Sequence, residues 1–280
     1  MAELSAYDLI SAEQAISLVG RDGILFLDAS WTYPGGPQPR TDRVIPGSIP
    51  FNIDAIADST SSLPHTLPSP ADFGQMVGAL GISNSTGLIV YDRMGVFTAP
   101  RVWWMFKIMG HDNIAVLNGG MPAWLAAGGE TAETLSRPVA PARFKALFNA
   151  DMLASFEQVR QAVDARDHRI LDARSPQRFA GSGAEPRPGM AAGHMPGASN
   201  LFFQTLMDEQ GLMDISRIPE SLRTEAAEPV ITTCGSGVTA CILTLALHLN
   251  GVQARVYDGS WSQWGSQDGL PVETGAGTSL

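Results

Sequence analysis

Cys234 has the residue type and surroundings best suited to nucleophilic chemistry in this sequence. It ends the apolar run PVITTC and is followed by GSGVTA and a second apolar run. A strand, a glycine-containing loop and a helix N-terminus place successive backbone N–H groups around one point, which stabilises an anion there. The pattern predicts a reactive thiolate that can also carry a persulfide. The alternative is a buried structural thiol at a strand end.

The conformation that the loop requires explains why it contains two glycines. Gly235 and Gly237 tolerate positive φ and carry no Cβ, so they let the backbone turn close to the sulfur. We expect the N–H groups of these glycines and of Val238 and Thr239 to stabilise a persulfide on Cys234. The four loop residues are therefore candidate binding residues.

A pair of arginines forms a second candidate group. Arg178 and Arg187 flank the segment RFAGSGAEPRPG, whose glycines and prolines predict an irregular loop. A guanidinium group is a planar fork that matches a carboxylate. The pair suits a small acidic substrate, and the alternative is that both side chains are solvated. Arg174, in DARS, is expected to pair with local carboxylates instead.

An internal repeat supplies the elements that must position these residues. Four landmarks of the first half recur in the same order in the second half, offset by roughly 140 to 150 positions. They are ILFLDAS and RILDARS, VIPGSIPFNI and HMPGASNLFF, GLIVYDRMGVFTAPR and PVITTCGSGVTAC, and LNGGMPAW and YDGSWSQW. Each half is therefore expected to form one domain of the same architecture.

Apolar periodicity predicts the content of each domain. The runs ILFLD, GLIVYD, PVITTC and ARVYD predict buried parallel strands. Helices are predicted at APRVWWMFKIMG and GVTACILTLALHLNG, each ended by a glycine. The alternation gives an α/β fold in which each domain is a mostly parallel sheet with helices on both faces. We expect an N-terminal domain over 1–135 and a C-terminal catalytic domain over 150–280, with the linker within TAETLSRPVAPARF.

Composition narrows the class of protein. The chain has 280 residues, of which 16% are charged, and a net charge of -10, which argues against a nucleic-acid or anionic-membrane partner. No apolar run approaches the ~20 residues that span a bilayer, and the N-terminus lacks the pattern of a signal peptide. Two cysteines make no disulfide framework, so a cytoplasmic protein is expected. Neither His111 nor His194 has metal-ligand spacing, and neither a metal nor a cofactor is expected.

The loop at 234–240, CGSGVTA, resembles the active-site loop of the 3-mercaptopyruvate sulfurtransferases, which belong to the rhodanese superfamily. The duplicated layout, HMPGA at 194–198 and DGSW at 258–261 are also similar to that family, and the similarity runs roughly from residue 27 to residue 271. The resemblance implies tandem rhodanese-like domains with a cleft between them. It also implies that the first domain is a non-catalytic copy, because Asp92 stands where Cys234 stands in the second.

The same resemblance implies an activity. The chain is expected to move sulfane sulfur from 3-mercaptopyruvate, through a persulfide on Cys234, to a thiol, thioredoxin or cyanide, and to release pyruvate. Arg178 and Arg187 match the arginines that bind the carboxylate and keto oxygen of the donor in similar enzymes.

Three further residues take roles only from the resemblance. Ser236 is expected to act with His65 and Asp54, in that Asp54 orients His65, which tunes Ser236 as a proton donor or acceptor. Without the resemblance, His65 is a loop residue between two prolines and Asp54 is a helix N-cap.

Other functions stay open at this point. Thiosulfate sulfurtransferases of the family carry basic residues just after the cysteine, where this chain has Gly235 and Ser236. A non-catalytic persulfide carrier or sensor needs no donor pocket, so the arginine pair weighs against it. A cysteine-dependent phosphatase needs an arginine six positions after Cys234, where Ala240 stands.

Overall fold

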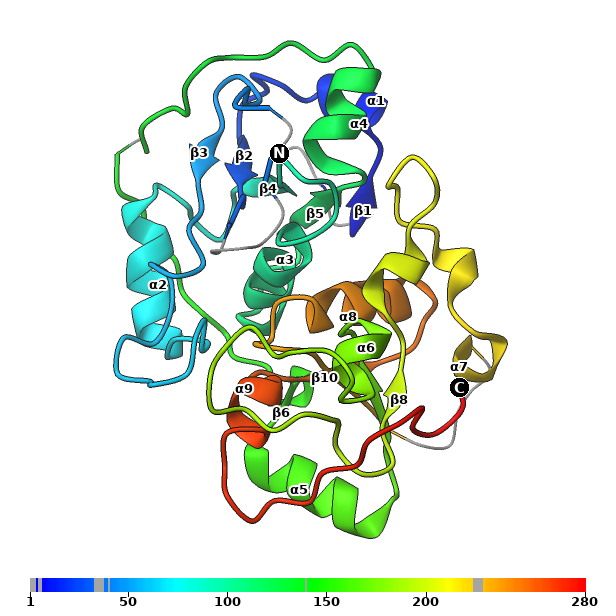
Figure 1. The fold of residues 1–280 in the computed structure, drawn as a ribbon. Helices are drawn as coiled ribbons and strands as arrows, with labels where there is room; N and C mark the ends of the chain where they lie inside the picture. The colour runs from blue at the N-terminus through cyan, green and yellow to red at the C-terminus, as the bar shows by residue number, and fades with distance from the viewer. Residues whose placement is uncertain (1–3, 5–6, 33–37, 40, 139, 224–228) are drawn as a thin grey trace. The chain divides into compact units, whose positions relative to one another are not determined.

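The computed structural model describes residues 4, 7–32, 38–39, 41–138, 140–223 and 229–280 (Figure 1). Contacts between Cα atoms divide the chain into two compact units. Unit 1 comprises Met1–Ser59, Leu67–Asn149 and Asp208–Met213, and unit 2 comprises Thr60–Thr66, Ala150–Met207 and Asp214–Leu280. Each unit therefore includes one short segment from the other half of the sequence.

Unit 1 contains a five-stranded parallel sheet with the order β1-β5-β4-β2-β3. Its strands are β1 (Leu9–Ile10), β2 (Ile24–Asp28), β3 (Ile49–Pro50), β4 (Gly87–Tyr91) and β5 (Ile114–Leu117). Its helices are α1 (Ala12–Ile16), α2 (Pro70–Ala79), α3 (Ala99–Ile108) and α4 (Gly120–Ala126). The strands predicted at ILFLD and GLIVYD and the helix predicted at APRVWWMFKIMG are confirmed as β2, β4 and α3.

Aromatic side chains join the helices of unit 1 to its sheet. Figure 1 shows α1 and α4 next to each other, and both pack on a cluster that includes Phe26 and Ile89. Trp124 of α4 meets Phe26 edge-on, with 5.9 Å between ring centroids. A second group of rings joins α2 to α3, with Phe73 and Phe106 at 5.1 Å between centroids.

Unit 2 repeats this topology. Its sheet has the order β6-β10-β9-β7-β8 and is parallel throughout, so each strand takes the place of its counterpart in unit 1. The strands are β6 (Leu153–Ala154), β7 (Arg169–Asp172), β8 (Ser199–Asn200), β9 (Val230–Thr233) and β10 (Ala254–Tyr257). The helices are α5 (Phe156–Ala165), α6 (Pro176–Phe179), α7 (Glu220–Arg223), α8 (Ala240–Leu249) and α9 (Ser260–Trp264). The predicted α/β class and the internal repeat are confirmed.

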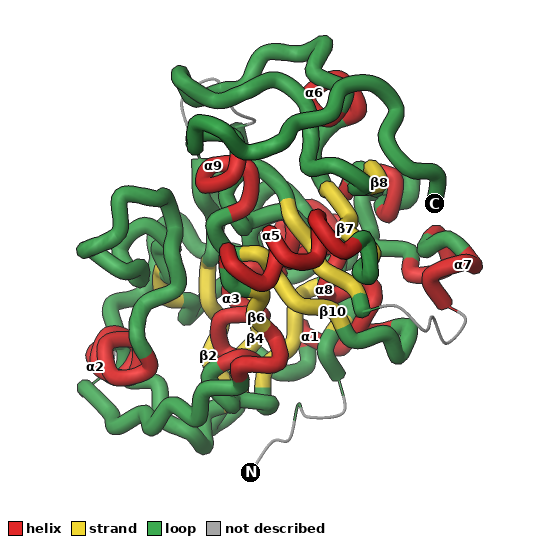
Figure 2. Tube along the Cα trace, turned by 90° about the horizontal axis from the view of Figure 1, so that it is seen from below, coloured by secondary structure: helices red, strands yellow, loops and turns green. Residues whose placement is uncertain are grey.

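Both faces of the sheet in unit 2 carry helices. Neighbouring residues of a strand point to opposite faces. Ile231 of β9 belongs to the apolar cluster of α5 and α9, whereas the hydroxyl of the next residue, Thr232, lies 2.8 Å from the hydroxyl of Thr244 in α8. Figure 2 shows long loop segments in green around α6 and α9. Arg187 lies in the loop after α6, whereas Arg178 belongs to α6 itself, so the irregular segment predicted from Arg178 onward begins only after this short helix.

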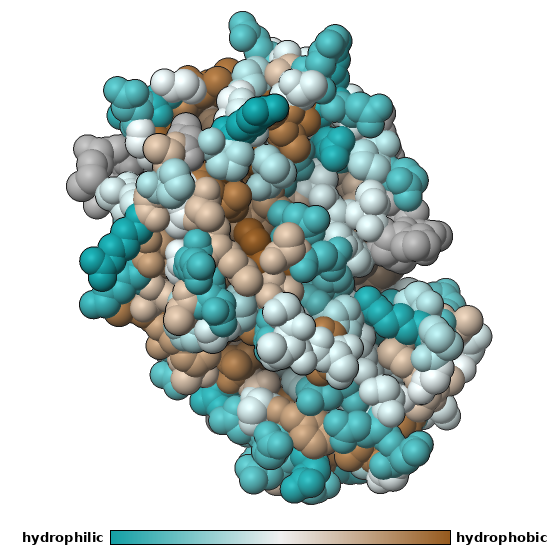
Figure 3. Space-filling model, turned by 90° about the vertical axis from the view of Figure 1, so that its left-hand side faces the viewer, coloured by the Kyte–Doolittle hydropathy of each residue, from teal (hydrophilic) through white to brown (hydrophobic). Residues whose placement is uncertain are grey.

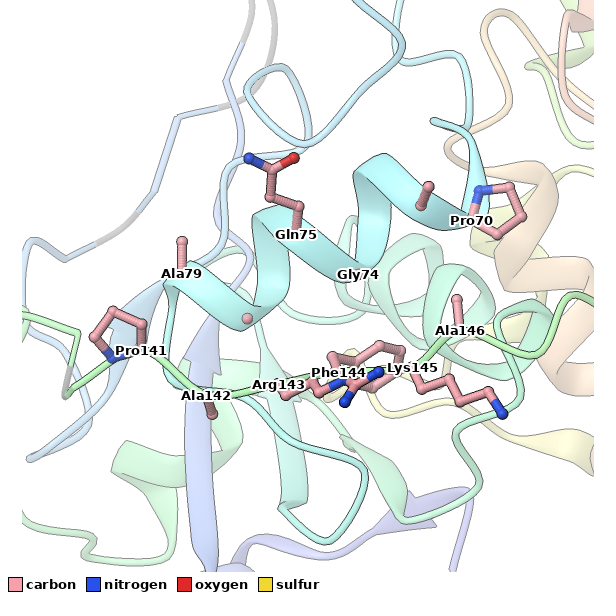
Figure 4. A pocket seen from close by; sticks show the side chains of 12 residues that line it. Pro70, Gly74, Gln75, Ala79, Pro141, Ala142, Arg143, Phe144, Lys145 and Ala146 are labelled. Carbon is pink, nitrogen blue, oxygen red and sulfur yellow. The ribbon is translucent and has the colours of Figure 1, made fainter.

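The connection after α4 lies against α2 within unit 1 (Figure 4). The N–H of Ala142 donates to the carbonyl oxygen of Gly78 at 2.9 Å, and the Asn84 amide binds both the N–H and the carbonyl oxygen of Lys145. A Cβ on Gly74 or Gly78 would come within 2.8 or 2.6 Å of a carbonyl oxygen of the connection. Only glycine allows this approach, so the end of the predicted linker is fixed on unit 1.

The surface is mixed in polarity. On the face that Figure 3 shows, hydrophobic residues form patches that hydrophilic residues interrupt. Across the residues that the structure describes, none of the helices has the length and apolar character needed to cross a membrane.

Candidate active site

Cys234 stands at the carboxyl end of the central strand of unit 2. It follows Thr233, the last residue of β9, and α8 begins at Ala240 after the loop. The strands β10 and β7 flank β9, and ligands of parallel α/β sheets bind at such carboxyl ends. The Cys234 side chain is buried, and the residue is 2% exposed. The structure therefore has the strand, loop and helix that the sequence predicts here.

Ser260 at the start of α9 fixes the first residue of the loop. Its Oγ accepts a hydrogen bond from the N–H of Cys234 at 3.1 Å and donates one to the carbonyl oxygen of Tyr257 at 2.8 Å. The same Oγ lies 4.0 Å from the Cys234 Sγ. Ser260 has φ +49, a left-handed conformation that costs a non-glycine residue about 1 kcal/mol. The hydroxyl contacts are therefore made by a strained residue.

The loop carbonyls turn toward α9. The Trp261 N–H donates to the Cys234 carbonyl oxygen at 3.0 Å, and Ser262 donates its N–H and its Oγ–H to the Gly235 carbonyl oxygen at 2.8 and 2.6 Å. In a trans peptide the N–H points opposite to the C=O, so the N–H groups of Gly235 and Ser236 point away from α9. Neither N–H has an acceptor among the residues described. Both donors are available to an anion bound at the loop.

Arg178 lies directly against the cysteine loop. It is the penultimate residue of α6, and a Cβ built on Gly235 would lie 2.9 Å from its Nη2. A side chain at position 235 would therefore displace the guanidinium group. This gives Gly235 a function beyond loop flexibility, because its missing side chain makes room for a cation against the loop backbone.

Arg187 reaches the same loop through one intervening side chain. Its Nη1 lies 3.4 Å from the Oγ of Ser262, which in turn bonds the Gly235 carbonyl oxygen. The structure thus brings both predicted arginines to the loop of Cys234, within unit 2.

Two buried carboxylates bind the neighbouring arginines. Arg174 forms a bidentate pair with Asp172 and reaches Glu185 at 2.8 Å. Burial opposes the charged form of Arg174, but these two carboxylates hold its pKa above the usual value. Glu185 also binds Arg178 at 2.6 Å. The guanidinium of Arg174 stacks over the Trp261 ring at 4.3 Å, so the network reaches α9 as well.

Ser236 and His65 both belong to unit 2. Ser236 is 8% exposed and lies in the cysteine loop, and His65 is 6% exposed and lies in the segment Thr60–Thr66. His65 has φ +58, which is uncommon for a residue with a Cβ.

Asp54 belongs to unit 1, where its side chain is exposed. Its Oδ2 accepts a hydrogen bond from the indole N–H of Trp31 at 2.8 Å. The proposed relay from Asp54 to His65 stays a prediction.

The counterpart loop of unit 1 holds Asp92 in place of the cysteine. Its Oδ1 accepts the N–H of Met94 at 3.0 Å, and its Oδ2 accepts those of Phe97, Thr98 and Ala99 at 2.8 to 3.2 Å. The side chain is fully buried, and this burial raises the pKa of Asp92 despite the four donors. The loop of unit 1 is therefore a cradle for an internal anion.

Sequence reasoning missed Ser260, Ser262 and Glu185 as parts of the site. Ser260 lies within the motif DGSW and Ser262 directly follows it, but their contacts with the cysteine loop depend on the packing of α9. Glu185 lies two positions before Arg187 in a loop rich in glycine and proline. The only sequence signal for it is an acidic residue between two arginines.

Other features of the molecule do not add to this site. A groove of about 700 Å³ lies in unit 1 between α2 and the connection at 141–146 (Figure 4), and none of its lining residues is a predicted site residue. No group of three histidine, cysteine or carboxylate side chains among the described residues has the arrangement of a metal site. Cys241 is a free, buried thiol whose S–H donates to the Gly237 carbonyl oxygen at 3.3 Å.

Comparison with known families decides where this fold and site belong. A family model described as "Rhodanese-like domain" matches residues 11–127 and 155–267, one match in each half of the chain. The chain belongs to the rhodanese-like family. The resemblance inferred from the cysteine loop and the duplicated layout is confirmed.

Curated relatives of this rhodanese-like protein are sulfurtransferases of two types. It is 41% identical over 268 residues to the thiosulfate sulfurtransferase of Cricetulus griseus, covering 90% of this chain and 88% of the relative. It is 39% identical over 249 residues to the 3-mercaptopyruvate sulfurtransferase of Rattus norvegicus, covering 85% and 84%.

Solved structures agree with this placement. The Tum1 protein of Saccharomyces cerevisiae superposes with a TM-score of 0.86 at 30% identity, covering 96% of this chain and 98% of the other. SseA of Escherichia coli, described as a 3-mercaptopyruvate sulfotransferase, superposes with a TM-score of 0.79 at 32% identity, covering 92% and 100%. The fold and the family are therefore consistent in sequence and structure.

Proposed function

We propose that this rhodanese-like protein is a sulfurtransferase that takes sulfur from 3-mercaptopyruvate onto Cys234 and releases pyruvate. The observation that carries the proposal is the placement of two arginines at one loop. Arg178 lies against Gly235, and Arg187 reaches the loop through Ser262. A sulfur donor with a carboxylate needs such cations, because Arg binds carboxylates bidentately.

The first half-reaction is written on Cys234. Its thiolate attacks the donor sulfur, an S–S bond forms, and the C–S bond breaks with its electron pair moving to the enolate of pyruvate. The proton of the donor thiol is released as the persulfide anion forms, and the enolate carbon takes up a proton. The N–H groups of the loop, from Gly235 to Thr239, stabilise the persulfide. Arg178 and Arg187 hold the carboxylate and keto oxygen.

Ser236, His65 and Asp54 are proposed to assist the proton transfer. Ser236 lies two residues after the nucleophile, in the same loop, and its side chain is buried. His65 shares unit 2 with it. A histidine next to a serine hydroxyl is suited to move a proton near neutral pH.

The second half-reaction needs an acceptor. A thiolate or cyanide attacks the outer sulfur of the persulfide, the S–S bond breaks, and the Cys234 thiolate is restored. The proposed acceptors are a small thiol, thioredoxin or cyanide. Sulfurtransferase relatives support transfer between small molecules.

Thiosulfate sulfurtransferase is the second candidate, because relatives of that type match over most of the chain. The identities of the two types differ by too little to choose the donor. Thiosulfate is a dianion, and the loop residues Gly235 and Ser236 add no positive charge. The local charge therefore favours 3-mercaptopyruvate.

Two wider proposals accompany the activity. Residues 1–135 and 150–280 are proposed as the two domains, with the first a non-catalytic copy because Asp92 replaces the nucleophile.

A cytoplasmic location is proposed from the two free cysteines, and one plant relative is described as mitochondrial. Microscopy of a tagged full-length chain tests the location.

The deciding experiment compares kcat/KM for 3-mercaptopyruvate and for thiosulfate with one shared acceptor. A higher value for 3-mercaptopyruvate supports the proposal, and a higher value for thiosulfate replaces it with the second candidate. Pyruvate release is followed over many enzyme equivalents in the same assay. Release that stops after one equivalent would identify a persulfide carrier.

A further inference from the structure

Glu185 stands between two arginines at the edge of the cysteine loop. Its side chain is 4% exposed, and its Oε1 is shared between the two arginines, because it also accepts the Nε–H of Arg178 at 3.3 Å. Oε1 binds the Nη1 of Arg174 at 2.8 Å, and Oε2 binds the Nη2 of Arg178 at 2.6 Å. The second of these nitrogens is the atom that lies against Gly235. The carboxylate thus touches the cation that is nearest to the loop backbone.

The charges of this network cancel. Arg174 is paired with Asp172 at 2.7 Å, with both side chains almost fully buried. Glu185 adds a negative charge against Arg178, so two arginines are matched by two carboxylates. Arg187 forms no ion pair with any residue that the structure describes, and its contact there is with the Ser262 hydroxyl. The loop therefore faces about one uncompensated positive charge.

We propose that Glu185 is a specificity-determining residue that sets this charge for a donor with a single carboxylate. The inference rests on the proposed function and adds to it the residue that discriminates against dianions. Without Glu185, Arg178 would present its full charge beside Gly235, and the site would favour a dianion such as thiosulfate. Glu185 acts through Arg178 and does not itself contact the donor.

The network offers a reason to expect a selective effect. Arg174 keeps its bidentate pair with Asp172 and its contact over Trp261 when Glu185 is replaced. The anchor of α9 and of the loop is therefore retained. Arg174 loses one of its two carboxylate partners but keeps Asp172, so the larger change falls on the charge and freedom of Arg178, whose side chain is already 26% exposed.

The test uses the full chain with the substitution Glu185→Gln and measures kcat/KM for both donors with one acceptor. Glutamine keeps the shape and one carbonyl oxygen but removes the charge. We expect the ratio of thiosulfate to 3-mercaptopyruvate to rise by about tenfold, mainly through a lower KM for thiosulfate, because a dianion gains twice the Coulomb energy of a monoanion. Glu133→Gln is the matched control, since that side chain is 83% exposed in unit 1 and the net charge changes equally.

Glu185→Asp adds a rescue test. It keeps the charge with a shorter reach, and we expect the ratio of the two donors to stay near the wild-type value even if both activities fall. An unchanged ratio in Glu185→Gln, or equal losses for both donors, would overturn the inference. The outcome is separate from the proposed function, because that depends on which donor the wild type prefers, whereas Glu185 is judged by the change in the ratio.

Discussion

The loop after β4 in unit 1 and the loop after β9 in unit 2 take the same place in sheets of the same order, yet they hold different groups. In unit 1 the Asp92 carboxylate accepts four N–H groups of its own loop. In unit 2 the Cys234 sulfur takes that place, and the N–H groups of Gly235 and Ser236 have no acceptor among the described residues. The fold supplies a cradle for an anion in both units. The residue at the start of the loop, Asp92 or Cys234, determines whether this anion is a carboxylate side chain or a species formed during the reaction.

The helix start beside each loop shows the same contrast. Gly120 and Ser260 are counterparts with φ +54 and +49. The residues after them make equivalent bonds, from the Met121 N–H to the Asp92 carbonyl oxygen and from the Trp261 N–H to that of Cys234, both at 3.0 Å. In unit 1 the residue in the left-handed conformation is Gly120, which adopts it without strain. Unit 2 accepts strain there because the serine hydroxyl binds the Cys234 N–H.

The largest expected effect comes from replacing the nucleophile. Cys234→Ser should lower kcat at least a thousandfold, because a serine hydroxyl neither forms a persulfide nor ionises near neutral pH. Thermal unfolding should change little, since the two side chains are similar in size. The matched control is Cys241→Ser, which alters the other free thiol and should retain turnover. Loss of activity in Cys241→Ser but not in Cys234→Ser would contradict the assignment of Cys234 as the nucleophile that takes the place of Asp92.

Removing the internal anion of unit 1 should cost stability instead. Asp92→Ala removes the acceptor of four N–H groups, two of them buried and two partly buried, and we expect a loss of about 3 kcal/mol in the free energy of unfolding. Asp92→Asn keeps one oxygen for the three donors at Oδ2 and should lose less. Urea unfolding of both variants measures this order. If Asp92→Ala unfolds at the wild-type urea concentration, the cradle of unit 1 contributes nothing.

Two substitutions at Ser260 distinguish the effect of backbone strain on stability from the effect of the hydroxyl hydrogen bonds. Ser260→Ala removes the hydroxyl and keeps the strain, and should destabilise the protein by about 1–2 kcal/mol. Ser260→Gly removes both and restores the solution that unit 1 uses at Gly120, so it should be the more stable of the two variants. We expect kcat to fall in both while KM for the donor changes less, because the hydroxyl positions Cys234. A stability order with alanine above glycine would contradict the assigned strain.

The smallest effect concerns pH. Burial lowers the pKa of His111, which packs against Phe106 and Phe144 in unit 1. The unfolded chain takes up this proton near pH 6.5 and the folded chain only at lower pH. Below pH 6.5 the unfolded state therefore binds more protons, and stability falls as the pH falls.

The check is the free energy of unfolding of wild type and His111→Gln between pH 7 and 5.5. The wild type should lose up to about 1 kcal/mol more than the variant over that range. Parallel pH curves for the two proteins would exclude His111 as the cause.

The comparison of units also shows what the sequence could predict. The strands, the two long helices and Cys234 at its junction follow from local apolar runs and glycines, and the structure has them in those places. Glu185 could not be found in this way, because an acidic residue in a glycine- and proline-rich loop looks solvated until α6 brings Arg178 to it. The strain at Ser260 likewise depends on tertiary packing, since nothing local requires a serine to adopt positive φ.

Each unit includes a short segment from the other half of the sequence, and this affects when unit 1 can complete its fold during synthesis. The side chain of Asn118 binds the backbone of Met213 on both its N–H and its carbonyl oxygen, and this segment, Asp208–Met213, belongs to unit 1. A ribosome delivers Asn118 long before it delivers Met213. The first unit therefore leaves the exit tunnel without its last segment, and its native contacts are completed only when synthesis of the second unit is well under way.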